Sequence, residues 1–389
     1  MKYLPAQMRP DRARPAVVVA LLLTVGSLSL AGCADDRVHK LDAQTSPQAV
    51  ESGAEQGGST APQAPAIAPA DTATRLVGDA LSSAPDSAKA DSIARADSVK
   101  VDYRHGEDPA FAREMGWPVK YPAPLPGALL PAHRIVAYYG NTHSTKMGVL
   151  GEYPKAEMLQ KLKDQVAKWN EADPDHPVVP ALQLIVSVAQ GAPGSTGNYR
   201  SIMWDSAVDN VHQWAKDING VFFIDIQTGH STIEQMLPKF EHFLKQPDVH
   251  LAVDPEFMMV YSGGAVPGTK IGSIKVSDIN WITDQVARIV RENHLPPKVV
   301  VIHRFTRNMV LGDTKDIVLH PEVQLVMNMD GWGAPWLKRD SYRDYIVRHP
   351  VEFTGFKLFY HNDTKKGDAL MQPAEVLKLR PQPLYIQYQ

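Results

Sequence analysis

The feature that most constrains the fold is a regular alternation of apolar runs and amphipathic segments over residues 134–389. Short runs typical of buried strands alternate with longer segments whose apolar residues recur at helical spacing. Eight such units in about 256 residues match the size and count of a (β/α)8 TIM barrel. The eight predicted strands span residues 134–139, 179–188, 221–226, 250–253, 298–303, 323–329, 355–360 and 384–388.

The lengths of the connecting segments also favour the barrel. Helix-to-strand connections such as 217–220 are short, whereas strand-to-helix connections such as 140–151 and 257–276 are long and rich in glycine. In a TIM barrel the strand-to-helix loops form the active site. The alternative is a doubly wound open sheet, for which we would expect a G-x-G-x-x-G turn after the first strand. Residues 140–151 lack that spacing, so we predict the barrel.

The first 33 residues have the pattern of a lipoprotein signal. Basic residues precede an apolar run of about 15 residues, which is short for a transmembrane helix of about 20. The run closes on Leu30-Ala31-Gly32-Cys33, which resembles the bacterial lipobox. That resemblance implies a lipidated Cys33 and a protein anchored to a membrane outside the cytoplasm, in the periplasm or at the cell surface. Cys33 is the only cysteine, so a disulfide scaffold is excluded.

Two further segments separate this signal from the barrel. Residues 34–105 are dominated by Ala, Ser, Pro and Asp, and no aromatic residue occurs between 34 and 102. Such a segment cannot bury enough apolar surface to order itself, so we predict a disordered tether. Residues 106–133 are rich in proline and are predicted to form a strap that leads into the first strand. The barrel domain then occupies residues 134–389.

The charge of the chain argues against nucleic acid as a partner. Charged residues make up 21% of the sequence, and the formal net charge is −3. Proteins that bind nucleic acid present a basic face that neutralises phosphates. We therefore expect no nucleic-acid partner.

Acidic residues gather at the ends of the predicted strands. Asp225 closes the third strand, Asp254 and Glu256 follow the fourth, and Asp330 follows the sixth. Apolar runs precede them, which places these carboxyl groups at the mouth of an apolar barrel. Burial there raises a carboxyl pKa, as a general acid requires. These four residues are the predicted catalytic groups.

Other polar and aromatic residues occupy the same strand ends and are predicted to bind the substrate. Sugar-binding sites combine hydrogen-bonding side chains with aromatic platforms. The tryptophans at 204, 214 and 281 lie in helical stretches and are interpreted as packing residues instead. The predicted substrate-binding residues are Tyr139, Asn141, Gln190, Gln227, His303, Trp332, Trp336, Tyr360 and Gln387.

The Asp254-Pro255-Glu256 motif on the fourth strand resembles barrel glycoside hydrolases of the chitinase and muramidase types. In the muramidase type an aspartate on the sixth strand joins this pair, at the position that Asp330 occupies here. The resemblance implies that Glu256 is the proton donor. It also implies that Asp254 is its partner, which orients an N-acetyl group or stabilises the cation.

The sequence thus predicts a glycoside hydrolase that acts on an envelope or extracellular polysaccharide by carboxylate chemistry. This prediction requires neither a metal nor another cofactor. One alternative is a metal-dependent barrel hydrolase or lyase, in which Asp225, Glu256, His303 and Asp330 would hold a divalent ion. Another is a non-catalytic envelope lipoprotein that binds glycan at the barrel rim.

Overall fold

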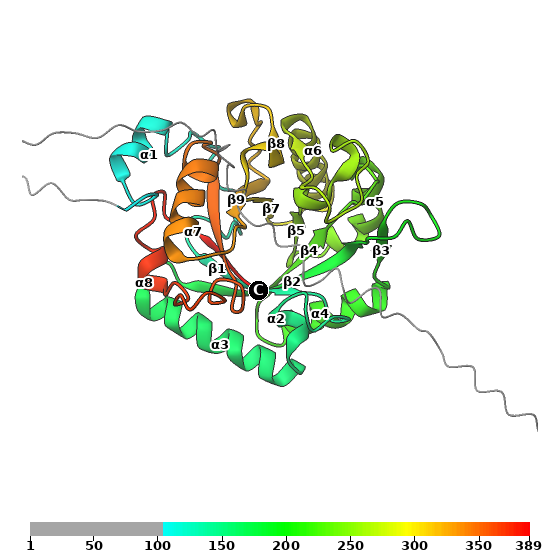
Figure 1. Ribbon diagram of the computed structural model, residues 1–389, viewed down its shortest axis with the longest axis horizontal. Helices are drawn as coiled ribbons and strands as arrows, with labels where there is room; N and C mark the ends of the chain where they lie inside the picture. Colours follow the sequence, from blue (N-terminus) through cyan, green and yellow to red (C-terminus); the bar gives the residue numbers. More distant parts are fainter. Residues whose placement is uncertain (1–103) are drawn as a thin grey trace, which may run out of the picture.

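The computed structural model describes residues 104–389, and there eight parallel strands form a closed barrel (Figure 1). The signal at 1–33 with Cys33, and the tether up to residue 103, lie outside the described residues. Pairing of the first strand with the second closes the ring, which confirms the TIM barrel and excludes the open sheet. In chain order the barrel strands are β1 (Arg134–Gly140), β2 (Val178–Ala189), β4 (Val221–Ile226), β5 (Val249–Val253), β7 (Lys298–Arg304), β9 (Val323–Met329), β10 (Phe353–Leu358) and β11 (Tyr385–Tyr388).

Helices surround this ring of strands (Figure 1). The α-helices are α1 (Pro109–Met115), α2 (Val149–Glu152), α3 (Lys155–Ala172), α4 (Asp205–Lys216), α5 (Ile233–Leu244), α6 (Val276–Glu292), α7 (Pro335–Tyr342) and α8 (Pro373–Val376). Shorter elements are β3 (Arg200–Ile202), β6 (Ile274–Lys275), β8 (Val310–Leu311), a π-helical turn (Arg343–Val347), and 3-10 turns at Pro255–Phe257, Met259–Tyr261, Arg307–Met309 and Thr314–Asp316.

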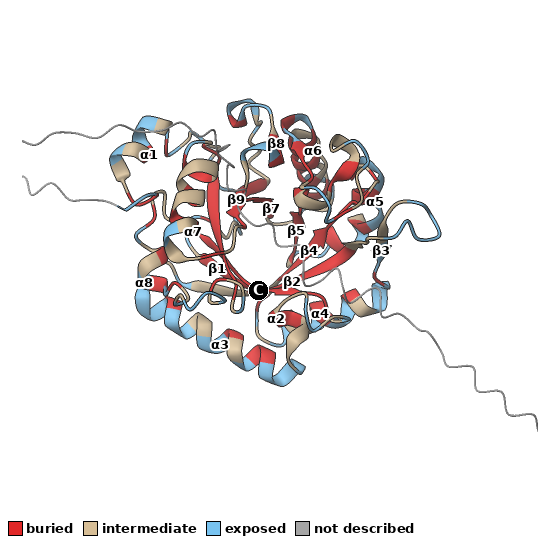
Figure 2. Ribbon diagram, in the orientation of Figure 1, coloured by how far each residue is buried: buried red, intermediate tan, exposed pale blue. Residues whose placement is uncertain are grey.

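The strands are buried on both faces, because each separates the inside of the barrel from the helices (Figure 2). Side chains that point inward, including Ile135, Phe223 and Val301, form one apolar cluster. Side chains that point outward, such as Val136 and Phe222, form a larger cluster with the helices. This double burial explains why the strands are continuous apolar runs in the sequence.

The proline-rich strap packs across the amino-terminal ends of the strands. The side-chain oxygen of Gln324 accepts hydrogen bonds from the main-chain N–H groups of Leu129 and Leu130, at 2.9 and 3.1 Å. Leu130 is buried in the cluster inside the barrel, and Tyr121 packs against Phe353. The strap therefore closes the end of the barrel opposite the strand-end acids.

The predicted strands differ from the observed ones mainly at β10, which ends at Leu358 rather than at residue 360. Trp204 precedes α4, which begins at Asp205, because residues 200–202 form β3 and pair antiparallel with the end of β2. Within residues 104–389 no helix is both long enough and apolar enough to cross a membrane.

Candidate active site

A cavity of about 320 Å³ opens at the carboxyl ends of the barrel strands. Three of the predicted catalytic acids, Asp254, Glu256 and Asp330, lie in its wall. The cavity therefore occupies the end of the barrel that forms active sites in this fold. The predicted substrate-binding residues that line it are Tyr139, Asn141, Gln190, Gln227 and Trp332.

Glu256 lies in a tight turn directly after β5. Asp254 caps this 3-10 turn by accepting a hydrogen bond from the main-chain N–H of Glu256 at 3.1 Å. The carbonyl of Glu256 accepts a second bond from the N–H of Gly272 at 2.6 Å. A side chain at 272 would clash, because its Cβ would lie 2.4 Å from the carbonyl oxygen of Pro255. The backbone of the turn is thus fixed from two sides.

The carboxyl group of Glu256 lines the cavity, and no other side chain among residues 104–389 forms a hydrogen bond or an ion pair with it. Burial raises its pKa well above the ordinary value, and the nearby charges of Asp254 and Asp330 raise it further. This environment therefore favours the protonated form of the Glu256 carboxyl, which faces the cavity. A general acid requires this state.

Asp254 is held more firmly than Glu256. One of its oxygens caps the turn, and the other accepts a hydrogen bond from the Gln227 amide at 3.2 Å. Burial raises the pKa of Asp254 to about 6; His303 opposes this rise, and Asp225 adds to it. Asp254 is thus mostly ionised at neutral pH.

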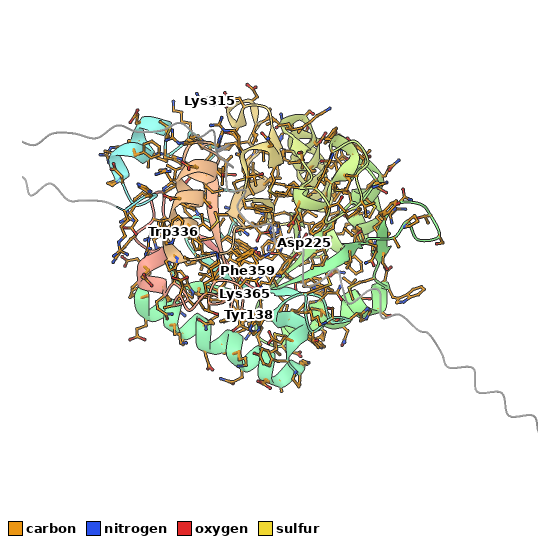
Figure 3. All side chains as sticks on the ribbon, viewed as in Figure 1. Tyr138, Asp225, Lys315, Trp336, Phe359 and Lys365 are labelled. Atoms are coloured by element: carbon orange, nitrogen blue, oxygen red, sulfur yellow. The ribbon has the colours of Figure 1, made fainter. Side chains whose placement is uncertain are left out.

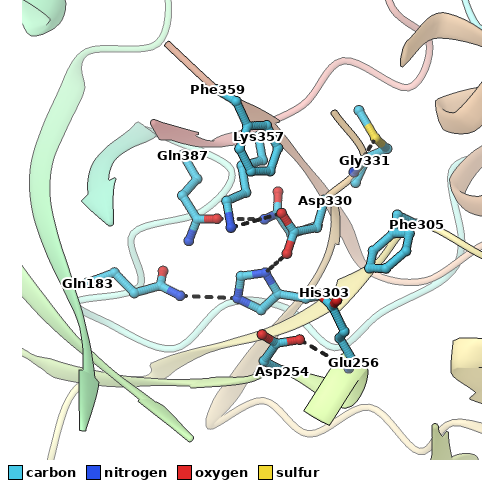
Figure 4. A network of polar contacts seen from close by, with 12 residues as sticks. Gln183, Asp254, Glu256, His303, Phe305, Asp330, Gly331, Lys357, Phe359 and Gln387 are labelled. Atoms are coloured by element: carbon cyan, nitrogen blue, oxygen red, sulfur yellow. Dashed lines mark hydrogen bonds and ion pairs between the residues drawn. The ribbon is translucent and has the colours of Figure 1, made fainter. Parts of the chain in front are cut away.

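His303 lies beneath the cavity and bridges two of the predicted acids, Asp330 and Asp225. Figure 4 shows its contact with Asp330. Its Nδ1 lies 2.8 Å from Asp330, and its Nε2 lies 3.1 Å from Asp225. Burial lowers the pKa of His303, but the two carboxylates outweigh burial and raise it to about 10. His303 is therefore an imidazolium that donates one hydrogen bond to each carboxylate.

Asp330 is held ionised by two cations. Its other oxygen lies 2.9 Å from the ammonium of Lys357 on β10. Burial opposes ionisation, but Lys357 and His303 outweigh it and keep the pKa of Asp330 below its ordinary value. The Lys357 ammonium also lies over the ring of Tyr139, 3.9 Å from the ring centre. The cavity wall thus combines Asp330, whose pKa is lowered, with Glu256, whose pKa is raised.

A polar layer inside the barrel supports His303 from below. Gln183 donates a hydrogen bond of 2.5 Å to the Asp225 oxygen that also faces His303. Tyr385 donates to the side-chain oxygen of Gln183, and Gln387 donates to the Tyr385 hydroxyl at 3.2 Å. Gln183, Tyr385 and Gln387 are fully buried, so this layer orients groups above it rather than meeting a substrate.

Several predicted roles need correction in view of these positions. Asp225 is fully buried beneath the cavity and bonds to His303, so it is not placed to act directly on a substrate. His303 and Gln387 belong to the same buried layer and do not bind substrate directly. Tyr360 lies outside the barrel, where its hydroxyl hydrogen-bonds to that of Tyr138 at 2.9 Å.

The aromatic residues of the cavity also differ in part from the prediction. Trp332 lines the cavity as expected, whereas Trp336 lies on α7, is 65% exposed and does not line it (Figure 3). Trp204, which the sequence indicated as a packing residue, is instead 80% exposed and lines the cavity mouth. Phe257 and Phe359 also line the cavity. The candidate sugar platforms are therefore Trp204 and Trp332.

Lys357 and Gln183 are the site residues that sequence analysis missed. Both are polar residues within apolar runs, at positions where an ordinary core residue would be expected. Burying such a group is costly unless it is paired. A polar residue that interrupts an apolar strand was therefore the sequence signal that could have identified both residues.

The metal-dependent alternative places His303 among the ligands. A histidine binds a metal through an unprotonated ring nitrogen, but both ring nitrogens of His303 already lie within hydrogen-bond distance of carboxylates. Within residues 104–389 there is no group of three His, Cys, Asp or Glu side chains arranged to hold a metal. The proposed ligand set therefore does not fit a metal site.

Comparison with known proteins gives partial structural similarities. The chain matches no family model and no curated protein sequence. Cel5A of Thermotoga maritima, solved in complex with cellobiose, is 11% identical, with 65% of this chain and 88% of that chain covered and a TM-score of 0.34. A ruminal GH26 endo-beta-1,4-mannanase is 10% identical, with 72% of this chain and 65% of that chain covered and a TM-score of 0.31. Both are glycoside hydrolases, but the barrel assignment here rests on the strand pairing described above.

Proposed function

We propose that the protein is a glycoside hydrolase that acts on an envelope or extracellular polysaccharide. The observation that carries this proposal is the placement of Glu256 and Asp330 in the wall of one cavity, in environments that shift their pKa values in opposite directions. Burial raises the pKa of Glu256, while Lys357 and His303 lower that of Asp330. Glycoside hydrolysis requires such a pair, one carboxyl group as the acid and one charged.

In this mechanism Glu256 donates its proton to the glycosidic oxygen as the bond to the leaving group breaks. Positive charge then develops on the sugar ring, until a water molecule adds to the ring carbon and returns a proton to the Glu256 carboxylate. Asp254 and Asp330 face the same cavity and stabilise that charge as carboxylates. Because the Asp330 carboxylate is fixed by Lys357 and His303, it needs little reorganisation during the reaction.

We further propose that a lipid on Cys33 anchors the protein to a bacterial membrane, outside the cytoplasm. The support is the lipobox-like sequence ending at Cys33 and the aromatic-free segment that follows. A flexible chain of about 70 residues has a mean reach of roughly 45 Å. The tether would therefore allow the barrel to reach polysaccharide beyond the membrane surface.

The test is release of reducing sugar from a panel of wall, capsular and extracellular polysaccharides, with the wild type compared with Glu256→Gln. Loss of a general acid costs about 10² to 10⁴ in rate, so Glu256→Gln should lose nearly all activity. Glu171→Gln is the matched control, because Glu171 is exposed near the end of α3. It should keep wild-type activity.

Three outcomes would contradict the proposal. Equal activity of the wild type and Glu256→Gln on every glycan would remove Glu256 as the acid. Binding of a glycan without hydrolysis by the wild type would favour the non-catalytic alternative. Activity that a chelator abolishes would instead favour a metal-dependent reaction.

A further inference from the structure

The cavity extends to one side of the catalytic acids, over the ends of β1 and β2. We call this extension the lateral arm. Its walls are the loop after β1 and the hairpin that β3 forms with β2, which Figure 1 shows projecting away from the barrel axis. The residues of the arm used below are His143, Lys146, Gln190, Ile202, Met203 and Trp204.

The first wall of the arm is rigid. The side chain of Asn141 donates a hydrogen bond to the carbonyl of Ile185 and accepts one from the N–H of His143, at 2.9 and 2.8 Å. Gly148, with φ of 129°, allows the loop to pack closely on β1, since a Cβ there would lie 2.3 Å from the carbonyl oxygen of Tyr139. The loop therefore holds His143 and Lys146 at fixed places on the rim.

The second wall is equally fixed. Ser201 and Ile202 pair with β2, and the N–H of Met203 donates to the carbonyl of Val186 at 2.9 Å. The sulfur of Met203 lies 3.3 Å from the Asn141 amide, which joins the two walls beneath the arm. Trp204 follows directly and is 80% exposed. Such exposure of a large apolar ring at a cavity mouth is characteristic of a binding surface.

The charges along the arm are positive. The acidic residues that line the cavity are Asp254, Glu256 and Asp330, and all three lie at the strand ends rather than in the arm. Lys146 is exposed, and its ammonium has no hydrogen-bond or ion-pair partner among residues 104–389. His143 lies beside it on the same loop. The arm thus offers an unpaired cation and an exposed aromatic ring in the wall of one cavity.

We propose that the lateral arm is a subsite for an acidic sugar unit, a uronate or another carboxylated residue, of a polymeric substrate. The ring of the sugar would stack on Trp204, and its carboxylate would pair with Lys146. This inference rests on the proposed glycoside hydrolase function, because the arm continues the cavity that contains Glu256. It adds a substrate class that the catalytic acids alone do not specify.

The test is calorimetric binding of polygalacturonate, alginate and hyaluronan to Glu256→Gln, which should bind without turnover. The same polymers after chemical reduction of their carboxyl groups serve as neutral probes. At least one acidic polymer should bind about tenfold more tightly than its reduced form. Raising the salt concentration should weaken this preference, because Lys146 is exposed.

Variants of the arm sharpen the test. Adding Lys146→Gln should remove the preference for the acidic polymer, and Lys146→Arg should retain it. Trp204→Ala should weaken binding of both forms. Lys168→Gln is the matched control, because Lys168 is exposed on α3. It should bind as the parent does.

Three results would each overturn the inference. The acidic and reduced polymers could bind equally, neither could bind, or the preference could survive Lys146→Gln. Failure of the proposed function can be told apart from failure of this inference, because the first is measured as loss of hydrolysis and the second as loss of the acidic preference in binding. If the wild type hydrolyses a neutral glycan in a Glu256-dependent manner and shows no acidic preference, only the inference on the lateral arm falls.

Discussion

Lys357 connects the chemistry of the three acids in the cavity. Its ammonium pairs with Asp330, and its charge lowers the pKa values of both Asp254 and Glu256. Removal of this charge therefore weakens the acidity of all three carboxyl groups together. A pH profile is the measurement that detects such a change.

We predict a bell-shaped dependence of kcat/KM on pH for the wild type. Activity should rise as Asp254 ionises near pH 6 and fall at higher pH as Glu256 loses its proton. Lys357→Met should move the acidic limb to higher pH, whereas Lys357→Arg should keep it in place. Lys168→Met serves as the control. An unchanged acidic limb in Lys357→Met would show that Lys357 does not act on Asp254.

The positions of the acids followed from the sequence because strand ends meet at one rim of a barrel. What the sequence did not contain was the depth of each side chain. Asp225 lies within β4 and points into the buried layer, whereas Glu256 lies beyond the end of β5 and reaches the cavity. A shift of a few residues along a strand therefore separates a residue of the buried layer from one that lines the cavity.

At the scale of elements, a buried ion pair holds the loop after β9 against β10. Lys338 on α7 pairs with Asp363 at 3.1 Å, and it donates to the carbonyls of Gly331 and Lys357 at 2.6 and 2.8 Å. Asp363 in turn accepts hydrogen bonds from the N–H groups of Gly333 and Phe359 at 2.9 and 3.0 Å. This pair positions both the Trp332 loop and the Lys357 backbone.

We predict that Asp363→Ala lowers the free energy of unfolding by about 3 to 5 kcal/mol, because Lys338 would remain buried without its partner. Hydrogen exchange at the amides of Gly333 and Phe359 should accelerate. Asp368→Ala, in the same loop, is the control and should change neither quantity. If both amides in Asp363→Ala exchanged hydrogen as slowly as in the wild type, this role of the ion pair would be disproved.

The elements themselves were largely predictable, since all eight barrel strands are buried on both faces and are mostly apolar in sequence. The exception is β3, whose three residues lie in a polar stretch. Its pairing with β2 depends on contacts distant from the local pattern, including a hydrogen bond of 3.0 Å from Arg200 to Ser231. Trp204 was misjudged for the same reason, because it precedes α4 instead of lying within it.

At the scale of the whole molecule, a carboxyl group at one end of the barrel bears on the proposed catalysis and one at the other end bears on stability. Glu256 at the carboxyl end faces a cavity and supports the proposed chemistry. Glu352 at the amino end is buried, and its side chain accepts a hydrogen bond from the N–H of Leu325 on β9 at 2.8 Å. Burial raises the pKa of Glu352 from 4.5 to about 8. Glu352 does not line the cavity, so its effect falls on the stability of the barrel.

We predict that Glu352 makes the barrel less stable as the pH rises. The folded state binds this proton more tightly than the unfolded state, so the stabilisation is complete below about pH 4.5 and is lost as the pH rises through about 8. At about 1.4 kcal/mol per pKa unit, the loss amounts to roughly 5 kcal/mol. Glu352→Gln is neutral at every pH and retains an oxygen for Leu325, so it should not show this loss.

Urea unfolding between pH 4.5 and 8.5 tests this prediction. The difference in unfolding free energy between Glu352→Gln and the wild type should grow in favour of the variant as the pH rises. Glu114→Gln, at an exposed position on α1, should follow the wild type. A constant difference across this range would mean that Glu352 is ionised in the folded protein, and the hydrogen bond to Leu325 would then be made by a carboxylate.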